Sequence, residues 1–193
     1  MKIPSARRPR GFTLVELLVV IAIIMVLASA GFAAGNAAIQ RARKATALAT
    51  AISIESAVNN FFTEYGSMPK DGDADTTVKT DTDTTFLKVL LGVEGSGSGV
   101  LNTRGLKLLS VKEGKAKKNG LIYNGDTVDG LYDPWGGPFN VILDLNYDEK
   151  VAPDTKASNA VTLNGRRVAV WSDGADGVNS TGKATDDVKT WGQ

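Results

Sequence analysis

The order of apolar and polar residues divides the chain into two different parts. From Leu14 to Ala34 nearly every residue is apolar, with only single small or polar interruptions. A helix of this length spans about 32 Å, which is close to the thickness of a bilayer core. Basic residues crowd the segment ahead of this run, and we expect them to hold the N-terminus in the cytoplasm: Lys2, Arg7, Arg8 and Arg10. The pattern therefore predicts a single membrane-spanning helix.

The helical pattern continues beyond the apolar run. No proline or glycine occurs between Asn36 and Tyr65, and good helix formers are common there. Apolar residues recur at intervals of three and four and form one stripe: Ala47, Ala51, Ile54, Val58, Phe61, Phe62 and Tyr65. Gly66 and then Pro69 provide a stop signal. We expect one long helix whose second half packs against a folded head.

The remainder of the chain predicts a small α+β head. Residues 68–85 are rich in Asp and Thr and are predicted to form a loop, and a short helix is predicted over 85–91. Strands are predicted over 120–123, 139–143 and 168–171, separated by glycine-containing turns. Between Leu143 and Val151, calcium-type residues alternate at Asp144, Asn146 and Asp148, but Glu149 stands where an EF-hand needs glycine, so we expect a hairpin turn there. The predicted fold class is α+β, with a long helix packed on a small antiparallel sheet.

Composition narrows the chemistry that this head can perform. The chain has no cysteine and no histidine, which excludes disulfides, thiol catalysis, histidine bases and the usual zinc ligands. An enzyme would have to use carboxylate or lysine chemistry, and no nucleophile motif is present. The net charge is only +1, so a nucleic-acid partner is not expected. We therefore predict a protein that is not an enzyme.

A single carboxylate changes the interpretation of the apolar run. Glu16 lies near the start of this run, where an ionisable side chain is costly and usually marks a function. A secretory signal peptide has a shorter apolar region, followed by a small-residue cleavage site. A plain signal anchor fits the charge and length of the run but leaves Glu16 unexplained.

The run Gly11–Glu16 (GFTLVE) resembles the processing site of type IV prepilins and type II secretion pseudopilins. The resemblance implies that a prepilin peptidase cuts after Gly11 and methylates the new N-terminal residue, Phe12. It also implies that Glu16 of one subunit pairs with the Phe12 amine of a neighbour inside a filament. Residues 1–11 would then be the leader, 12–35 the transmembrane and filament-core helix, and 36–193 the periplasmic head.

Two segments of the head resemble the G-type major pseudopilin of type II secretion systems. One is Asp133–Phe139 (DPWGGPF), in which Trp135 and Phe139 are expected to anchor a loop on the core of the head. The other is Trp171–Gly177 (WSDGADG), together with a tail containing Asp186, Asp187, Val188 and Trp191. The resemblance implies one structural calcium ion, held by side chains of Asp176, Asp186 and Asp187 and by backbone oxygens near Ser172 and Val178. Carboxylate and carbonyl oxygens are the ligands that Ca²⁺ prefers. The other interpretation of this segment is a mobile acidic C-terminal tail without an ion.

These resemblances imply a structural subunit that polymerises with copies of itself. Its other partners would be prepilin peptidase, minor pseudopilins and an assembly platform in the bacterial inner membrane. The head would lie in the periplasm, and the filament would drive protein export. A type IV pilus subunit for adhesion, motility or DNA uptake is the structural alternative. A binding module or carboxylate enzyme on a simple membrane anchor is the alternative from another class.

Overall fold

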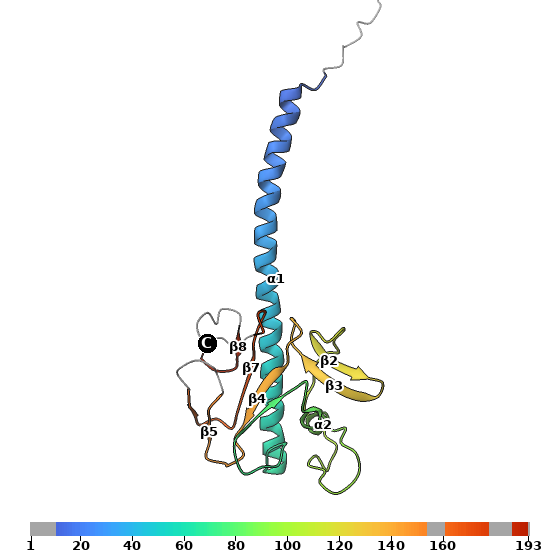
Figure 1. The fold of residues 1–193 in the computed structure, drawn as a ribbon, viewed down its shortest axis with the longest axis vertical. Coiled ribbons are helices and arrows are strands. Elements are labelled where there is room, and N and C mark those ends of the chain that lie inside the picture. Colours follow the sequence, from blue (N-terminus) through green and yellow to red (C-terminus); the bar gives the residue numbers. More distant parts are fainter. Residues whose placement is uncertain (1–10, 154–160, 178–186, 193) are drawn as a thin grey trace, which may run out of the picture. The chain divides into compact units, whose positions relative to one another are not determined.

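The computed structural model describes residues 11–153, 161–177 and 187–192. The chain forms two compact units, Met1–Arg41 and Ala42–Gln193. Helix α1 (Leu14–Tyr65) contributes its first part to one unit and its second part to the other. Figure 1 shows α1 and the strands that follow it. The architecture is α+β and consistent with a pilin-like fold.

The first unit contains the beginning of α1. Its large apolar side chains are exposed, and the exposed fraction is 80% for Leu14 and 57% for Ile24. Among the residues that the structure describes, no helix combines the length and the apolar character needed to cross a membrane.

The second unit is built around the second part of α1. The predicted apolar stripe is confirmed, because Ala51, Ile54, Val58 and Phe61 are completely buried. The helix ends at Tyr65, where the Gly66 amide donates to the Phe62 carbonyl at 2.8 Å. Gly66 has φ of +70°, a left-handed conformation that glycine adopts at little cost, as the stop signal predicted.

A four-stranded antiparallel sheet forms the centre of this unit. Its strands lie in the order β1-β4-β7-β8: β1 (Thr76–Lys79), β4 (Phe139–Leu143), β7 (Val168–Ser172) and β8 (Val188–Lys189). In β4 and β7 every residue is buried. Strands buried on both faces have near-continuous apolar sequences rather than alternating ones, and these two strands do.

Three smaller elements surround the sheet. Helix α2 (Thr84–Leu91) begins after Asp83, whose carboxylate accepts the Phe86 amide at 3.2 Å. Two hairpins complete the unit: β2 (Gly120–Asn124) with β3 (Thr127–Tyr132), and β5 (Lys150–Val151) with β6 (Leu163–Asn164).

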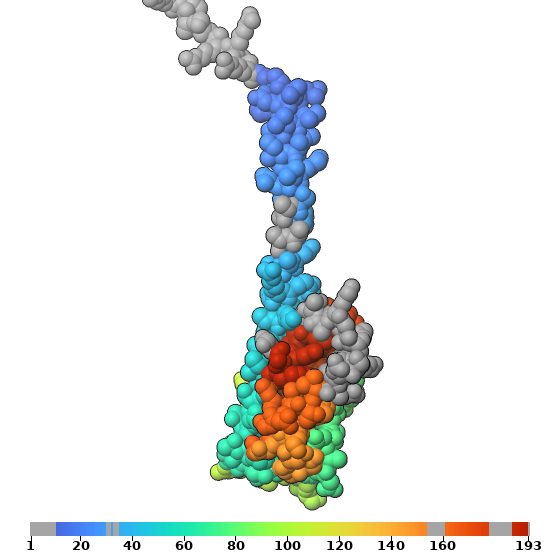
Figure 2. Space-filling view, turned by 90° about the vertical axis from the view of Figure 1, so that its left-hand side faces the viewer, coloured from blue at the N-terminus to red at the C-terminus, as the bar shows by residue number. Residues whose placement is uncertain are grey.

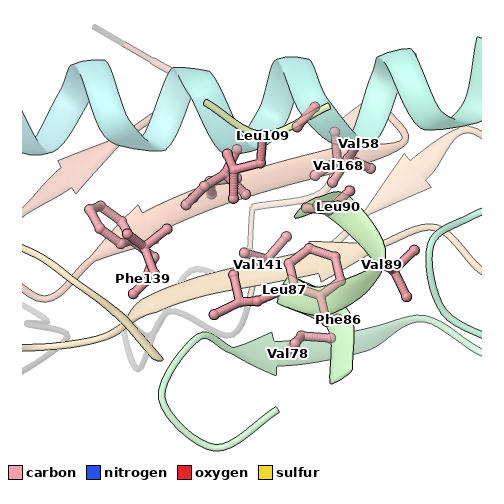
Figure 3. Close-up of a cluster of buried hydrophobic side chains, with 14 of the residues drawn as sticks. Val58, Val78, Phe86, Leu87, Val89, Leu90, Leu109, Phe139, Val141 and Val168 are labelled. Carbon is pink, nitrogen blue, oxygen red and sulfur yellow. The ribbon is translucent and has the colours of Figure 1, made fainter. Parts of the chain in front are cut away.

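The main hydrophobic core lies between α1, α2 and the sheet. Figure 3 shows side chains from all three converging: Val58 of α1, Leu87 and Leu90 of α2, and Val78, Val141 and Val168 of the sheet. A second, smaller cluster contains Ile142, Trp171 and Trp191. The strands therefore pack on both faces, and the C-terminal segment belongs to the folded unit.

Two predictions of local structure need correction. The Asp- and Thr-rich loop contains β1, which pairs with β4 from Thr76↔Leu143 to Lys79↔Asn140. The hairpin between Leu143 and Val151 is wrong, because β4 pairs with β1 and β7 while β5 pairs with β6. The buried Asp144 carboxylate instead accepts the amides of Asp148 and Glu149, which closes the loop without strand pairing.

Candidate functional site

The N-terminal candidate site is the segment from Gly11 to Glu16. Gly11, Phe12 and Thr13 precede the first residue of α1, and all three are exposed. The Phe12 side chain is 77% exposed, and a Cβ atom added to Gly11 would have no neighbour within 4 Å. The peptide bond between Gly11 and Phe12 is therefore open to an enzyme.

Glu16 is not an isolated carboxylate at the start of the helix. Its Oε2 atom accepts the Thr13 amide at 3.3 Å and the Thr13 hydroxyl at 3.2 Å. In return, the Thr13 hydroxyl oxygen accepts the Glu16 amide at 3.2 Å. This reciprocal arrangement is a capping box, which satisfies amides that the first helical turn cannot pair internally. The carboxylate also lies at the positive end of the helix dipole.

The C-terminal candidate site is the loop between β7 and β8. The two strands pair at Ser172↔Val188 and Trp171↔Lys189, so the loop starts and ends at one place. Trp171 and Trp191 pack edge to face, with 5.9 Å between ring centroids. Figure 2 shows the dark red segment around β8 on the surface of this unit, beside β7. Among the described residues of this segment, Val188–Lys189 form β8 and Trp191 belongs to a hydrophobic cluster, so 187–192 are part of the folded head.

Some of the predicted calcium ligands lie in the described part of the chain and others lie outside it. Asp176 is exposed, four residues after Ser172, and the Asp187 side chain is only 1% exposed, with one oxygen 3.8 Å from the Lys189 ammonium. Asp186 and Val178 lie outside the described residues. Within the described part of the chain, no three acidic side chains gather at a metal-sized site. The strand register pairs Ser172 with Val188, the residue after Asp187, and all the predicted donors are oxygen atoms, as calcium requires.

The Ser172 hydroxyl belongs to a different network, centred on Asp133. It donates to Asp133 Oδ2 at 2.5 Å and accepts the Gly174 amide at 3.2 Å. Asp133 Oδ1 accepts three backbone amides at 2.7–2.9 Å, from Trp135, Gly136 and Gly137. The Asp133 residue is 1% exposed. This buried carboxylate therefore fixes the Asp133–Phe139 loop and ties it to the end of β7.

Asp173 has an unusual environment next to this network. Burial raises the pKa of its carboxyl group, and the nearby Asp133 charge acts in the same direction. The Asn140 amide, 3.3 Å away, and the charge of Lys79 oppose this shift. A carboxylate held partly out of water beside the predicted calcium loop would gain from a cation.

Comparison with protein families gives one decisive observation. Residues 6–32 match the prokaryotic N-terminal methylation motif. The motif indicates a type IV pilin-like substrate of prepilin peptidase, and it suggests a membrane-anchored, export-related subunit. It further implies processing and polymerisation. Comparison with curated proteins and with solved structures gave no match.

The sequence interpretation missed two features of these sites. The capping box could have been found, because Thr13 and Glu16 have the T-x-x-E spacing directly before an apolar run. The role of Asp133 had a weaker signal, since Asp-Pro-x-Gly sequences indicate a turn but not its buried partner, Ser172. Trp135 was expected to anchor its loop on the core, but it is only half-buried and belongs to neither hydrophobic cluster. Phe139 does lie in the main core.

Proposed function

We propose that this chain is the structural subunit of a type II secretion pseudopilus. Prepilin peptidase cuts after Gly11 and methylates Phe12, and the processed subunits polymerise through α1 to drive protein export. The observation that carries the proposal is the methylation motif at residues 6–32, with its exposed cleavage point. The N-terminus is cytoplasmic, the segment 12–35 lies in the inner membrane, and the head lies in the periplasm.

The arrangement of Glu16 supports a role in assembly. Before assembly, its carboxylate caps its own helix through Thr13. Cleavage creates a positive amine on Phe12, two residues before α1 begins at Leu14. In a filament core, Glu16 of one subunit pairs with this amine of a neighbour, and an unpaired charge there would be expensive. Because a wrong subunit register would leave the Glu16 charge unpaired, its free-energy cost favours the correct register.

The head supports secretion over a type IV pilus. The Asp133–Phe139 loop and the C-terminal segment resemble those of the G-type major pseudopilin. One structural calcium ion, held by Asp176, Asp186 and Asp187 with backbone oxygens near Ser172 and Val178, would order the loop between β7 and β8. The minor pseudopilins and the inner-membrane platform are the other partners. In this proposal the subunit catalyses nothing, in keeping with a chain without histidine or cysteine.

A gene deletion tests the proposed function directly. We expect the deletion strain to lose specific proteins from the medium, while its surface filaments are unchanged in the microscope. Restoring the gene supplies the control. Loss of surface filaments with normal export would contradict the secretion proposal and assign the subunit to type IV pili. A tethered enzyme or binding module would change neither readout and would retain its leader.

A further inference from the structure

A lysine-rich turn lies against the loop that Asp133 holds. The turn covers Lys112–Lys118 and is attached to β2, because Gly114 donates to the Leu121 carbonyl and Leu121 donates to the Lys112 carbonyl, both at 2.9 Å. The Asn119 amide then donates to the Asp133 carbonyl at 2.7 Å. The two segments therefore form one continuous surface rather than two independent loops.

This surface combines a fixed loop with a charged turn. Trp135 is half-buried on the loop, whose backbone is fixed by three amide hydrogen bonds to Asp133. A Cβ atom added to Gly136 would lie 3.3 Å from the Lys117 carbonyl oxygen and 3.4 Å from the Lys118 side chain, so the turn and the loop are in close contact. A preorganised aromatic side chain with a polar border is typical of protein interfaces.

Most lysines of this turn are available to a binding partner. Lys112, Lys115 and Lys118 are exposed, and in the described part of the chain none has an ion-pair partner within 4 Å. Lys117 differs, because its ammonium lies 3.2 Å from Asp129. The turn contains one acidic residue, the exposed Glu113. We call Lys112, Lys115 and Lys118 together with Trp135 the basic surface.

An acidic segment, opposite in charge to the basic surface, leads into the four-stranded sheet near the end of β4. Residues 71–75 (DGDAD) lead into β1, and the carboxylates of Asp71 and Asp73 are exposed. Because Thr76 pairs with Leu143, this segment lies at the end of β4, whereas the Trp135 loop precedes its start at Phe139. Five strand residues separate the two by roughly 15 Å. They cannot meet within one copy.

We propose that the basic surface binds the segment Asp71–Asp75 of a second copy of this chain. The inference rests on the proposed function, because it requires a homopolymer. Opposite charges at the two ends make the contact head-to-tail, and such a contact leaves both ends of the growing assembly open. It adds a contact between heads to the assembly through α1.

Cysteine crosslinking tests this contact in the full-length chain, which has no native cysteine. In the double variant Asp73→Cys with Lys118→Cys, oxidation of the assembled fraction should give a ladder of dimers, trimers and longer products. Each single variant should give no ladder. Asp73→Cys with Asp126→Cys is the matched control, since Asp126 is exposed at the turn between β2 and β3. Monomers dispersed in detergent should not crosslink.

Charge exchange supplies a second readout. In the double-cysteine variant, Lys115→Glu should reduce the ladder at least tenfold, and so should Asp71→Lys. Combining these two substitutions in the same variant should restore it. Filaments of the wild-type chain without a ladder in the double-cysteine variant would overturn this inference alone. Failure of the wild-type chain to polymerise after leader removal would instead overturn the proposed function. Loss of filaments in the lysine variants without any crosslink would assign the lysines to a partner other than a second copy.

Discussion

At the scale of single residues, the Asp133 side chain connects two segments of the head through hydrogen bonds. Its carboxylate accepts four hydrogen bonds, three from backbone amides and one from the Ser172 hydroxyl. Hydrogen bonds to an ionised group are stronger than neutral ones, and a buried donor left without an acceptor costs about 1–3 kcal/mol. Asp133 therefore couples the Trp135 loop to the end of β7.

Replacing Asp133 should destabilise the second compact unit strongly. In the fragment Ala42–Gln193, we expect Asp133→Ala to lower the free energy of unfolding by about 3 kcal/mol or more, because the buried Ser172 hydroxyl and three part-buried amides lose their acceptor. Ser172→Ala should cost about 1 kcal/mol, since one donor disappears with its bond. Urea unfolding followed by tryptophan fluorescence measures both. Asp126→Ala, at an exposed turn, is the control and should change stability by under about 0.5 kcal/mol. A cost for Asp133→Ala no larger than that of the control would contradict this role.

Whether such residues can be predicted from the sequence depends on how many residues separate the two partners along the chain. Thr13 and Glu16 are three residues apart, so the capping box is visible in the sequence as a local motif. Asp133 and Ser172 are brought together by the pairing of β4 with β7, and no local pattern indicates that pairing. Gly11, Phe12 and Glu16 were identified through a resemblance, and their functional roles stay predictions.

At the scale of elements, the edge strand β8 depends on its neighbours more than on its own sequence. It contains only Val188 and Lys189. Its position is fixed by the Thr190 amide, which donates to the Val170 carbonyl at 3.0 Å, and by Trp191, which packs on Trp171. A strand of two residues has little stability alone, so the aromatic contact should decide whether β8 remains paired.

Removing the Trp191 ring should release β8 before the rest of the unit. We expect Trp191→Ala to speed hydrogen exchange at the Thr190 amide by at least tenfold, while amides of β4 exchange as before. Trp191→Phe should retain most of the protection, because an aromatic ring remains. Exchange measured by NMR separates the two strands, and Tyr123→Ala, on an exposed position of β2, serves as the control. Equal protection in Trp191→Ala and the control would show that the backbone ladder alone holds β8.

The dependence of a strand on its neighbours also explains which elements can be predicted from the sequence. The helices ending at Tyr65 and Leu91, and the strands β4 and β7, have strong local patterns and were predicted within one residue of their bounds. Strand β1 has the sequence TTVK in an Asp-rich segment, and only Val78 enters the core. It forms because β4 offers a free edge, which is a property of the fold rather than of the segment.

At the scale of the whole molecule, the methylation motif and the hydrophobic core lie in separate parts of the chain. The exposed apolar side chains and the methylation motif belong to the first unit, and the closed hydrophobic core belongs to the second. In the second unit, the loop between β7 and β8 joins two strands that are already paired at Ser172 and Val188. Calcium at this loop would therefore stabilise the head without being needed to build the sheet.

This separation predicts a graded response of the head to calcium. We expect calcium to raise the melting temperature of the fragment Ala42–Gln193, because a ligand at a hundredfold excess over its Kd adds about 2.7 kcal/mol to stability. Asp186→Asn with Asp187→Asn should abolish the increase, because both substitutions replace anionic ligands by neutral ones. With a chelator present, the wild-type fragment should still unfold cooperatively at a lower temperature, since neither hydrophobic cluster contains a predicted calcium ligand. Asp71→Asn with Asp73→Asn removes the same charge from the exposed loop before β1 and should leave the calcium response intact.

Identical melting of the wild-type fragment in calcium and in chelator would contradict the site, and complete unfolding in chelator would contradict the independence of the sheet.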